Sequence, residues 1–286
     1  MKKEIKDRFP VWCKDTDKKY SLIMSDDIDS LMCYTFQNWY FNRQVKFFFD
    51  ANAQGFTQKL YKSKEVAENV GNENVVGLDI ALEADIKTWD NHIVKIKRTD
   101  TTNSNSANLN LALDVCQINY TDKACVSTFI TMLSYYDIDI STWSKEQLAV
   151  LCCIDGLYYP FREGSNFIAT GRKNLKILDY EFLEDFIKEN MKLIINLKNK
   201  LKLDAKIKVG ADEKLTTAMD LDKLSEIFED IFWYISLPTC EFTEKSTLEK
   251  RYVQNINYSK NELIEKYNIF NFALCYKNKG VISYLK

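Results

Sequence analysis

The chain has 286 residues, of which 46% are hydrophobic and 28% are charged, and its formal net charge at pH 7 is −2. Such a composition is typical of a globular protein with a large buried core, and the small net charge argues against a broad basic surface for duplex nucleic acid. No apolar stretch reaches the roughly 20 residues that a membrane-spanning helix needs, and no signal peptide is recognisable, so the sequence predicts a cytoplasmic protein with no membrane contact.

Short apolar runs in the first half of the chain are each followed by acidic residues. Residues 18–25 predict a strand that ends at Asp26, and residues 27–40 predict the helix that follows it. The later runs are 45–49 before Asp50, 75–78 before Asp79 with a short helix predicted at 64–69 between them, 86–89 before Asp90, and 148–154 before Asp155. Short β-rich runs that alternate with helical segments are typical of α/β proteins, so we expect a mostly parallel sheet flanked by helices.

The run 148–154 is open to a second interpretation. Ser144 and Gln147 have the spacing of a capping box, which predicts a helix that ends near Cys153 instead of a strand. Earlier in the chain, residues 99–110 are rich in Thr, Asn and Ser. Their composition predicts a flexible loop that covers a site beside Asp90-Asn91-His92.

The second half of the chain has mainly helical patterns. Helices are predicted for residues 122–136, 180–202 and 221–235, and a closing β-hairpin is predicted for residues 270–285. We therefore expect an α/β domain over residues 1–178. A smaller, helix-rich C-terminal domain with a short β element is expected over residues 179–286.

The acidic residues that follow the predicted strands should lie close together, because the carboxyl ends of parallel strands meet at one edge of a sheet. Carboxylates brought together repel one another unless a cation lies between them, and hard cations prefer carboxylate oxygen. We therefore predict that Asp27, Asp29, Asp79 and Asp155 bind one or two Mn²⁺ or Mg²⁺ ions. A simpler interpretation of Asp27 is that it caps the helix that follows it.

These segments also occur in a particular order. Asp27-Ile28-Asp29-Ser30 opens a helix, Asp79 follows a strand, Asp90-Asn91-His92 follows another, residues 124–128 open a further helix, and Asp155-Gly156 ends an apolar run. In this order, over roughly residues 18–160, they resemble the motifs of the DHH phosphoesterase superfamily, with Asp-Asn-His in place of the Asp-His-His signature.

The resemblance implies a DHH-like fold and a metal-dependent phosphoesterase that acts on a nucleotide, a short oligonucleotide or another phosphorylated small molecule. The four aspartates named above would hold the ions, and Asp90 would orient His92 toward the substrate phosphate or the leaving oxygen. Asn91, Arg162 and Arg172 are candidates for substrate contact. The structural interpretation of His92, the only histidine in the chain, is a hydrogen-bonded scaffold residue, and that of the two arginines is solvated surface charge.

Departures from the family pattern leave alternatives open. Residues 23–25 hold no histidine before the first motif, Asn91 replaces a histidine that is normally a ligand, and no Gly-rich segment follows residue 175. An inactive relative that binds a nucleotide or a protein partner is therefore the second hypothesis, and a purely structural interaction protein is the third. The sequence leaves the oligomeric state open, a homo-oligomer included.

Overall fold

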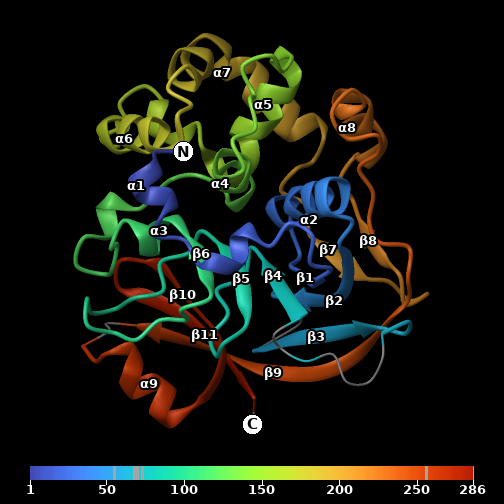
Figure 1. Ribbon diagram of the computed structural model, residues 1–286, viewed down its shortest axis with the longest axis vertical. Helices are drawn as coiled ribbons and strands as arrows, with labels where there is room; N and C mark the ends of the chain where they lie inside the picture. The colour runs from blue at the N-terminus through green and yellow to red at the C-terminus, as the bar shows by residue number, and fades with distance from the viewer. Residues whose placement is uncertain (54–55, 67–70, 72–73, 255–256, 286) are drawn as a thin grey trace.

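The largest element of the structure is a nine-stranded mixed sheet (Figure 1). The computed structural model describes residues 1–53, 56–66, 71, 74–254 and 257–285, so that residues 67–69 of the predicted helix 64–69 lie outside the described residues. In sheet order the strands are β10 (Asn268–Tyr276), β11 (Lys279–Leu285), β9 (Phe242–Gln254), β3 (Thr57–Ser63), β2 (Gln44–Asp50), β1 (Ser21–Met24), β4 (Val75–Leu78), β5 (Lys87–Asp90) and β6 (Ser106–Asn108). Strands β7 (Ile207–Val209) and β8 (Leu215–Thr217) form a separate antiparallel pair.

The sheet is parallel in one half and antiparallel in the other. Strands β2, β1, β4, β5 and β6 run parallel to one another, whereas β3, β9, β11 and β10 pair antiparallel. The expected parallel sheet is therefore confirmed for the half that carries the acidic residues. Because β3 pairs with β9, strands from residues 1–178 and from 179–286 belong to one continuous sheet. The division into two domains stays a prediction.

Helices flank this sheet, and several of them pack on one another at the end of the molecule away from β9 (Figure 1). Helix α2 packs against α4, and α5 packs against α7. The helices are α1 (Lys3–Lys6), α2 (Ile28–Phe41), α3 (Leu109–Ala112), α4 (Thr128–Tyr135), α5 (Lys145–Cys153), α6 (Ile168–Leu178), α7 (Leu183–Lys200), α8 (Leu221–Phe228) and α9 (Lys260–Lys266). Within the described part of the chain, none of the helices is both long enough and apolar enough to cross a membrane.

The structure decides between strand and helix for residues 148–154, and it corrects part of the predicted loop 99–110. Ser144 and Gln147 form both hydrogen bonds of a capping box, so residues 148–153 belong to helix α5 and not to a strand. Within the predicted loop 99–110, residues 106–108 form strand β6, because they pair with β5 and their side chains are buried. The expectation of a flexible loop is therefore wrong for that part of the segment.

Strand β1 shows how the sheet separates two parts of the core. Successive side chains of a strand point to opposite faces. Leu22 and Met24 lie in the main core, which includes helices α2 and α4. Ile23 lies on the other face, in a smaller apolar cluster with Phe47 and Leu248.

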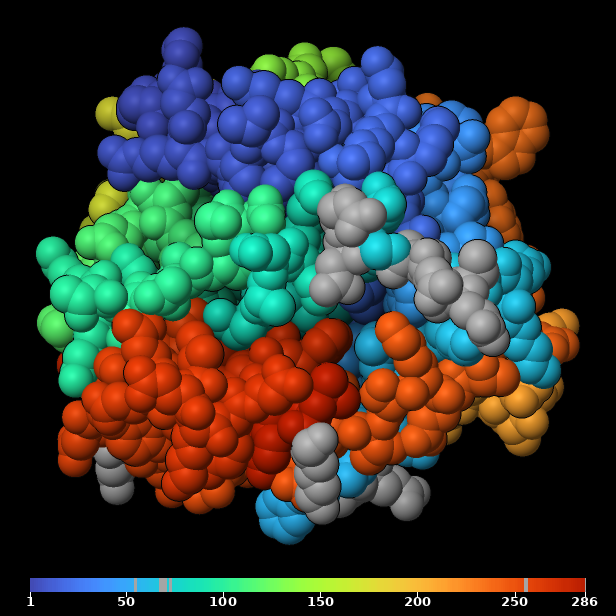
Figure 2. Space-filling view, turned by 60° about the horizontal axis from the view of Figure 1, so that its bottom comes forward, coloured from blue at the N-terminus to red at the C-terminus, as the bar shows by residue number. Residues whose placement is uncertain are grey.

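The sheet curls until its two halves meet. Residues that follow β4 and β5 pair with β10, through antiparallel bridges from Leu82 to Asn271 and from Ile93 to Leu274. Figure 2 shows the resulting face, where the orange and red C-terminal segment lies directly beside the teal and green segment that contains β5 and β6. The curl therefore brings a C-terminal strand next to the loops that follow two of the parallel strands.

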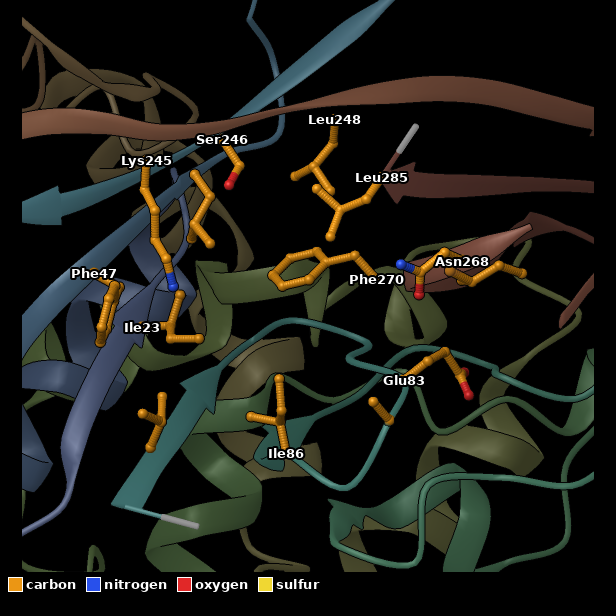
Figure 3. A pocket seen from close by; sticks show the side chains of 14 residues that line it. Ile23, Phe47, Glu83, Ile86, Lys245, Ser246, Leu248, Asn268, Phe270 and Leu285 are labelled. Carbon is orange, nitrogen blue, oxygen red and sulfur yellow. The ribbon is translucent and has the colours of Figure 1, made fainter. Parts of the chain in front are cut away.

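A cavity of about 320 Å³ lies inside the curl (Figure 3). Apolar side chains from the concave face of the parallel strands, including Ile23 and Phe47, face Leu248 and Phe270 across it. No helix in the described part of the chain covers this face, because β9 and β10 fold over it. The apolar cluster on this face is therefore enclosed by the sheet itself.

Candidate metal centre

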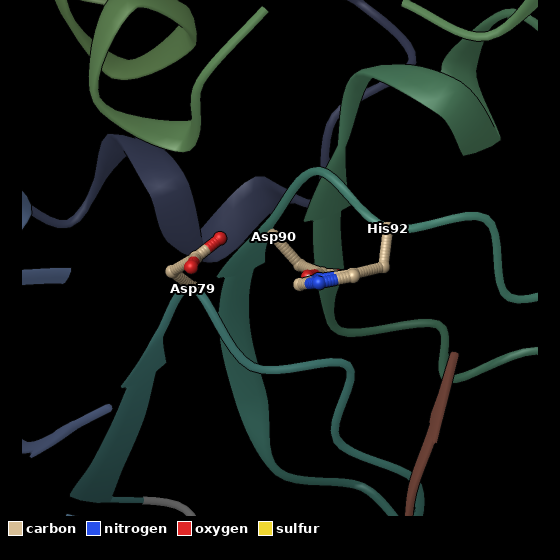
Figure 4. A group of neighbouring side chains, drawn as sticks. All are labelled: Asp79, Asp90 and His92. Atoms are coloured by element: carbon tan, nitrogen blue, oxygen red, sulfur yellow. The ribbon is translucent and has the colours of Figure 1, made fainter. Parts of the chain in front are cut away.

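The acidic residues predicted to converge do meet at one edge of the parallel strands. Asp29, Asp79 and Asp155 each offer a carboxylate oxygen within 4.8 Å of the others. Asp79 also belongs to a second group with Asp90 and His92, whose ligand atoms meet the same limit (Figure 4). Each group can hold a metal ion, and Asp79 is common to both.

The connection between β1 and α2 explains this convergence. Strands β1 and β4 are parallel neighbours, so the residues that follow them emerge at the same edge. The hydroxyl of Ser30 donates a hydrogen bond to the carbonyl of Leu78 (2.9 Å) and accepts one from the N–H of Ser25 (2.7 Å). A small residue in the first turn of α2 thus fixes the turn after β1 against the end of β4.

Asp29 has a structural role beside any role as a ligand. It is fully buried, and its two carboxylate oxygens accept hydrogen bonds from the N–H groups of Thr128 (2.7 Å) and Phe129 (2.8 Å). These are the first residues of α4, whose N–H groups have no partner within the helix. Asp29 therefore joins α2 to α4. Its oxygens also accept two longer contacts, from the thiol of Cys33 at 3.7 Å and from the amide of Asn91 at 3.5 Å, and a bound cation would replace these two contacts.

Asp79 and Asp155 are held by their backbones as well as by hydrogen bonds. Both adopt left-handed conformations, with φ of 56° and 49°, a region that aspartate tolerates better than most residues. The Thr128 hydroxyl donates to Asp79 Oδ1 at 2.8 Å. Asp155 belongs to a short 3-10 turn, Ile154–Gly156, at the end of α5. The apolar run before Asp155 is therefore the end of helix α5, and the turn after that helix places Asp155 at the centre.

Asn91 lies between two of the carboxylates. Its side-chain amide donates to Asp155, to the carbonyl of Val126 at 3.1 Å, and to Asp29 at 3.5 Å. The amide nitrogen thus faces the oxygens that a cation would bind. Because the nitrogen and oxygen of an amide have almost the same shape, a half-turn of the side chain would present the oxygen instead.

Asp90 orients His92, as expected from the sequence. Nδ1 of His92 lies 2.7 Å from Asp90 Oδ1, so Nε2 is the ring nitrogen that Asp90 does not contact. Asn108 donates to Asp90 Oδ2 at 2.8 Å and to the backbone carbonyl of His92 at 2.7 Å. Burial alone would lower the pKa of His92, but the charge of Asp90 and its hydrogen bond outweigh burial and raise this pKa to about 9. Asn108, which lies in strand β6, is a residue of this site that sequence reasoning missed.

The clustered carboxyl groups are difficult to ionise together. Burial, and after it the charges of neighbouring carboxylates, raise the pKa of Asp29 and the pKa of Asp79 well above the ordinary range. Asp155 is more exposed than the other two, but desolvation and the charge of Asp27 raise its pKa as well. A divalent cation would remove this mutual repulsion and favour the charged carboxylates.

Asp27, which the sequence predicted as a metal ligand, has two other partners. It is the N-cap of α2 and accepts a hydrogen bond from the N–H of Ser30 at 3.3 Å. Its other carboxylate oxygen lies 3.1 Å from Nζ of Lys206. The capping interpretation is therefore confirmed, and Asp27 faces a lysine.

Lys206 is a residue of this site that sequence reasoning missed, because its partners lie far away in the chain. Besides Asp27, its ammonium group lies 3.2 Å from the buried carboxylate of Asp26, which also accepts a hydrogen bond from Asn52 at 2.7 Å. The neighbouring Ile207 donates its N–H to the backbone carbonyl of Asp26 at 2.8 Å. The start of β7 thus anchors this lysine beside the turn that follows β1.

Two cavities adjoin the centre, and both are lined by Asp27 and Lys206. The smaller, about 170 Å³, also has Ser25, Asp79 and His92 in its wall. The larger, about 320 Å³, extends past Asp155. The acidic groups therefore border hollow space that can admit a ligand from either side of Lys206.

The two arginines proposed for substrate contact have different surroundings. Arg162 stacks on Tyr159 at 4.3 Å from the ring centre, and Tyr159 lines the larger cavity. Arg172 lies within helix α6 and forms an ion pair with Glu184, with Nε 2.7 and 2.8 Å from its two carboxylate oxygens. Arg162 therefore supports a residue of the cavity wall and does not itself line the cavity. The charge of Arg172 is balanced by Glu184.

Comparisons of the chain with family models, with curated proteins and with solved structures found no match. The centre is therefore described by its own geometry: hard oxygen ligands, an oriented imidazole and adjoining cavities.

Proposed function

We propose that the protein is a metal-dependent phosphoesterase that acts on a nucleotide, a short oligonucleotide or another phosphorylated small molecule. The observation that carries this proposal is the meeting of Asp29, Asp79 and Asp155 within 4.8 Å of one another, beside a histidine oriented by a carboxylate. An oxygen-only ligand set fits Mn²⁺ or Mg²⁺ better than softer metals. The resemblance to the DHH superfamily supports the same class of reaction.

In this proposal, Asp29, Asp79 and Asp155 hold the ion, with Asn91 as a neutral neighbour. A bound Mn²⁺ or Mg²⁺ supplies positive charge to the phosphoryl oxygens and lowers the pKa of a water molecule. Asp90 holds His92 through Nδ1, so its Nε2 can donate a proton to the leaving oxygen. Against the effect of burial, the charge and hydrogen bond of Asp90 raise the pKa of His92 and so favour the protonated imidazole, which is the form that can donate.

The test is hydrolysis of a generic phosphodiester and of short oligonucleotides with Mn²⁺ or Mg²⁺. We expect Asp79→Asn to lower the rate roughly 100-fold or more, since Asp79 is shared by both ligand groups. Asp137→Asn is a matched control, because Asp137 has a similar left-handed conformation (φ 56°) but follows the opposite end of α4. Equal rates in the wild type and Asp79→Asn would contradict the proposal.

The position of Asn91 favours one alternative. Its amide donates hydrogen bonds to Asp155 and Asp29. A histidine that binds a metal ion would instead direct a ring nitrogen's lone pair at the ion. An inactive relative that binds a nucleotide or a protein partner would retain this arrangement. Calorimetry separates the two functions, because heat from Mn²⁺ or Mg²⁺ binding without turnover of any phosphodiester favours the inactive relative.

A further inference from the structure

The hydroxyl of Ser25 has no hydrogen-bond partner within the described part of the chain, although Ser25 is only 4% exposed. A buried hydroxyl left unpaired is unfavourable for folding, so it calls for an explanation. Ser25 lines the smaller of the two cavities at the centre, together with Lys206 and His92. An unpaired donor beside an ammonium and an imidazole is suited to an anion.

We propose that Ser25, Lys206 and His92 bind a terminal phosphoryl group of the substrate, next to the cation held through Asp79. This inference rests on the proposed function and specifies its substrate. The cavity of about 170 Å³ is smaller than the roughly 300 Å³ at which pockets for drug-sized ligands begin. It therefore has room for a phosphoryl group and not for a nucleoside.

Binding of the phosphoryl group depends on the divalent cation. Asp26, Asp27 and Asp79 line the same cavity as Lys206, so carboxylates outnumber the lysine there. By itself such a wall repels an anion, and a divalent ion on Asp79 offsets two of its negative charges. The ion and the phosphoryl group should therefore each raise the affinity of the other by the same factor.

The remainder of the substrate lies in the larger cavity on the other side of Lys206. Tyr159 lines that cavity and is 45% exposed, with the guanidinium of Arg162 stacked 4.3 Å from its ring centre. The ring also packs on Tyr158, with ring centres 4.5 Å apart, so the part of Tyr159 that stays exposed is the surface that a nucleobase can contact. Lys198 lines the same cavity, where it forms an ion pair with Asp204 at 2.7 Å. The ligand class is therefore a nucleotide with a terminal phosphate, and inorganic phosphate is its smallest part.

The experiment is calorimetry of the full chain with Mg²⁺, followed by inorganic phosphate or a nucleoside 5′-monophosphate. We expect both anions to bind only with Mg²⁺ present, the nucleotide more tightly. Ser25→Ala should weaken both about tenfold or more, which is the effect of one hydrogen bond to a charged group. Tyr159→Ala should weaken only the nucleotide, to the affinity of phosphate.

Ser134→Ala provides the control. Ser134 is also buried, but its hydroxyl donates to the carbonyl of Leu178 at 2.8 Å. This variant should lower the melting temperature and leave phosphate binding unchanged. Ser25→Ala should instead keep or raise the melting temperature, since it removes an unpaired group.

Three outcomes would contradict parts of the proposal. Unchanged phosphate affinity in Ser25→Ala, with Mg²⁺ still bound, overturns the subsite alone. Absence of Mg²⁺ binding in the wild type overturns the proposed function and the subsite with it. Equal wild-type affinity for the two anions overturns the nucleotide assignment.

Discussion

Nζ of Lys206 lies 3.1 Å from Asp27 and 3.2 Å from Asp26, so an ammonium group already occupies the position between these two carboxylates. The charges of both aspartates raise the pKa of Lys206, although burial acts in the opposite direction, and the lysine stays charged. In the second ligand group, Nδ1 of His92 is already bonded to Asp90. We therefore expect the centre to bind a single divalent ion per chain, at Asp29, Asp79 and Asp155. Calorimetry with Mn²⁺ measures this stoichiometry, and two ions per chain in the wild type would contradict it.

Asp79→Asn should have opposite effects with and without metal. Because the folded-state pKa of Asp79 is raised, its contribution to stability is present below the unfolded pKa near 4 and is lost as the pH rises through the folded value. Without metal, the variant should therefore lose less stability than the wild type between about pH 4 and pH 7. With Mg²⁺ at about 100 times its Kd, the wild type alone should gain about 2.7 kcal/mol. Thermal melts at several pH values measure both effects, and a wild type indifferent to the ion would refute the second.

Asn91→His should strengthen Mn²⁺ binding. Asn91 now places an amide nitrogen against Asp155 and Asp29, and an imidazole at this position would offer a nitrogen ligand in its place. We expect Mn²⁺ to gain more than Mg²⁺, because imidazole suits Mn²⁺ better than Mg²⁺. Melting curves in each ion test this. Weaker binding of Mn²⁺ in Asn91→His would show that Asn91 does not stand in a ligand position.

His92 is the only histidine, so its titration can be followed by NMR without ambiguity. Its pKa is raised from the usual 6.5 to about 9 by Asp90 against the effect of burial. Asp90→Asn should lower this pKa, because it removes the charge and the hydrogen bond that raise it most. The stability that this pair contributes is fully present below pH 6.5 and is lost as the pH rises through about 9. A pKa that does not change in Asp90→Asn would exclude this pairing.

Lys260→Met should destabilise the protein strongly at neutral pH. Nζ of Lys260 lies 2.8 and 3.0 Å from the two carboxylate oxygens of Glu83, and both side chains are buried. Removing one partner of a buried ion pair typically costs about 3–5 kcal/mol, because the other charge is left unpaired. The double variant Lys260→Met with Glu83→Gln should recover much of this loss. Urea denaturation measures the free energy of unfolding, and a single variant as unstable as the double one would contradict the explanation.

The sequence was sufficient to predict the elements that carry the acidic residues. Strands β1, β4 and β5, together with helix α2, are short regular patterns whose burial and capping are local properties. The meeting of Asp29 and Asp79 followed from β1 and β4 being parallel neighbours, whereas Asp155 joins them from the turn at the end of helix α5. Local pattern and strand order together therefore place most of the candidate ligands.

What the sequence could not provide depends on distant parts of the chain. Strand β9 alternates poorly between apolar and polar residues, since much of it is exposed, and it becomes a strand by pairing with β3 and β11. Nothing in the sequence around Lys206 indicates a role, because the hydrogen bond from Ile207 to Asp26 that places this lysine joins distant parts of the chain. Ser25 becomes informative only when its hydroxyl is found buried and unpaired. Such properties arise from tertiary packing and leave no periodic trace.

The bridges from Leu82 to Asn271 and from Ile93 to Leu274 have a consequence for synthesis on the ribosome. Asp79 and His92 leave the exit tunnel long before the residues of β10 that pair with the segments beside them. Until those residues emerge, the backbone groups of Ala81 and Ile93 that bond to β10 have no partners. Pairing between segments so distant in the chain also slows folding. We therefore expect nascent chains that stop before β10 to bind divalent ions weakly, so that the centre matures only after β10 has been synthesised.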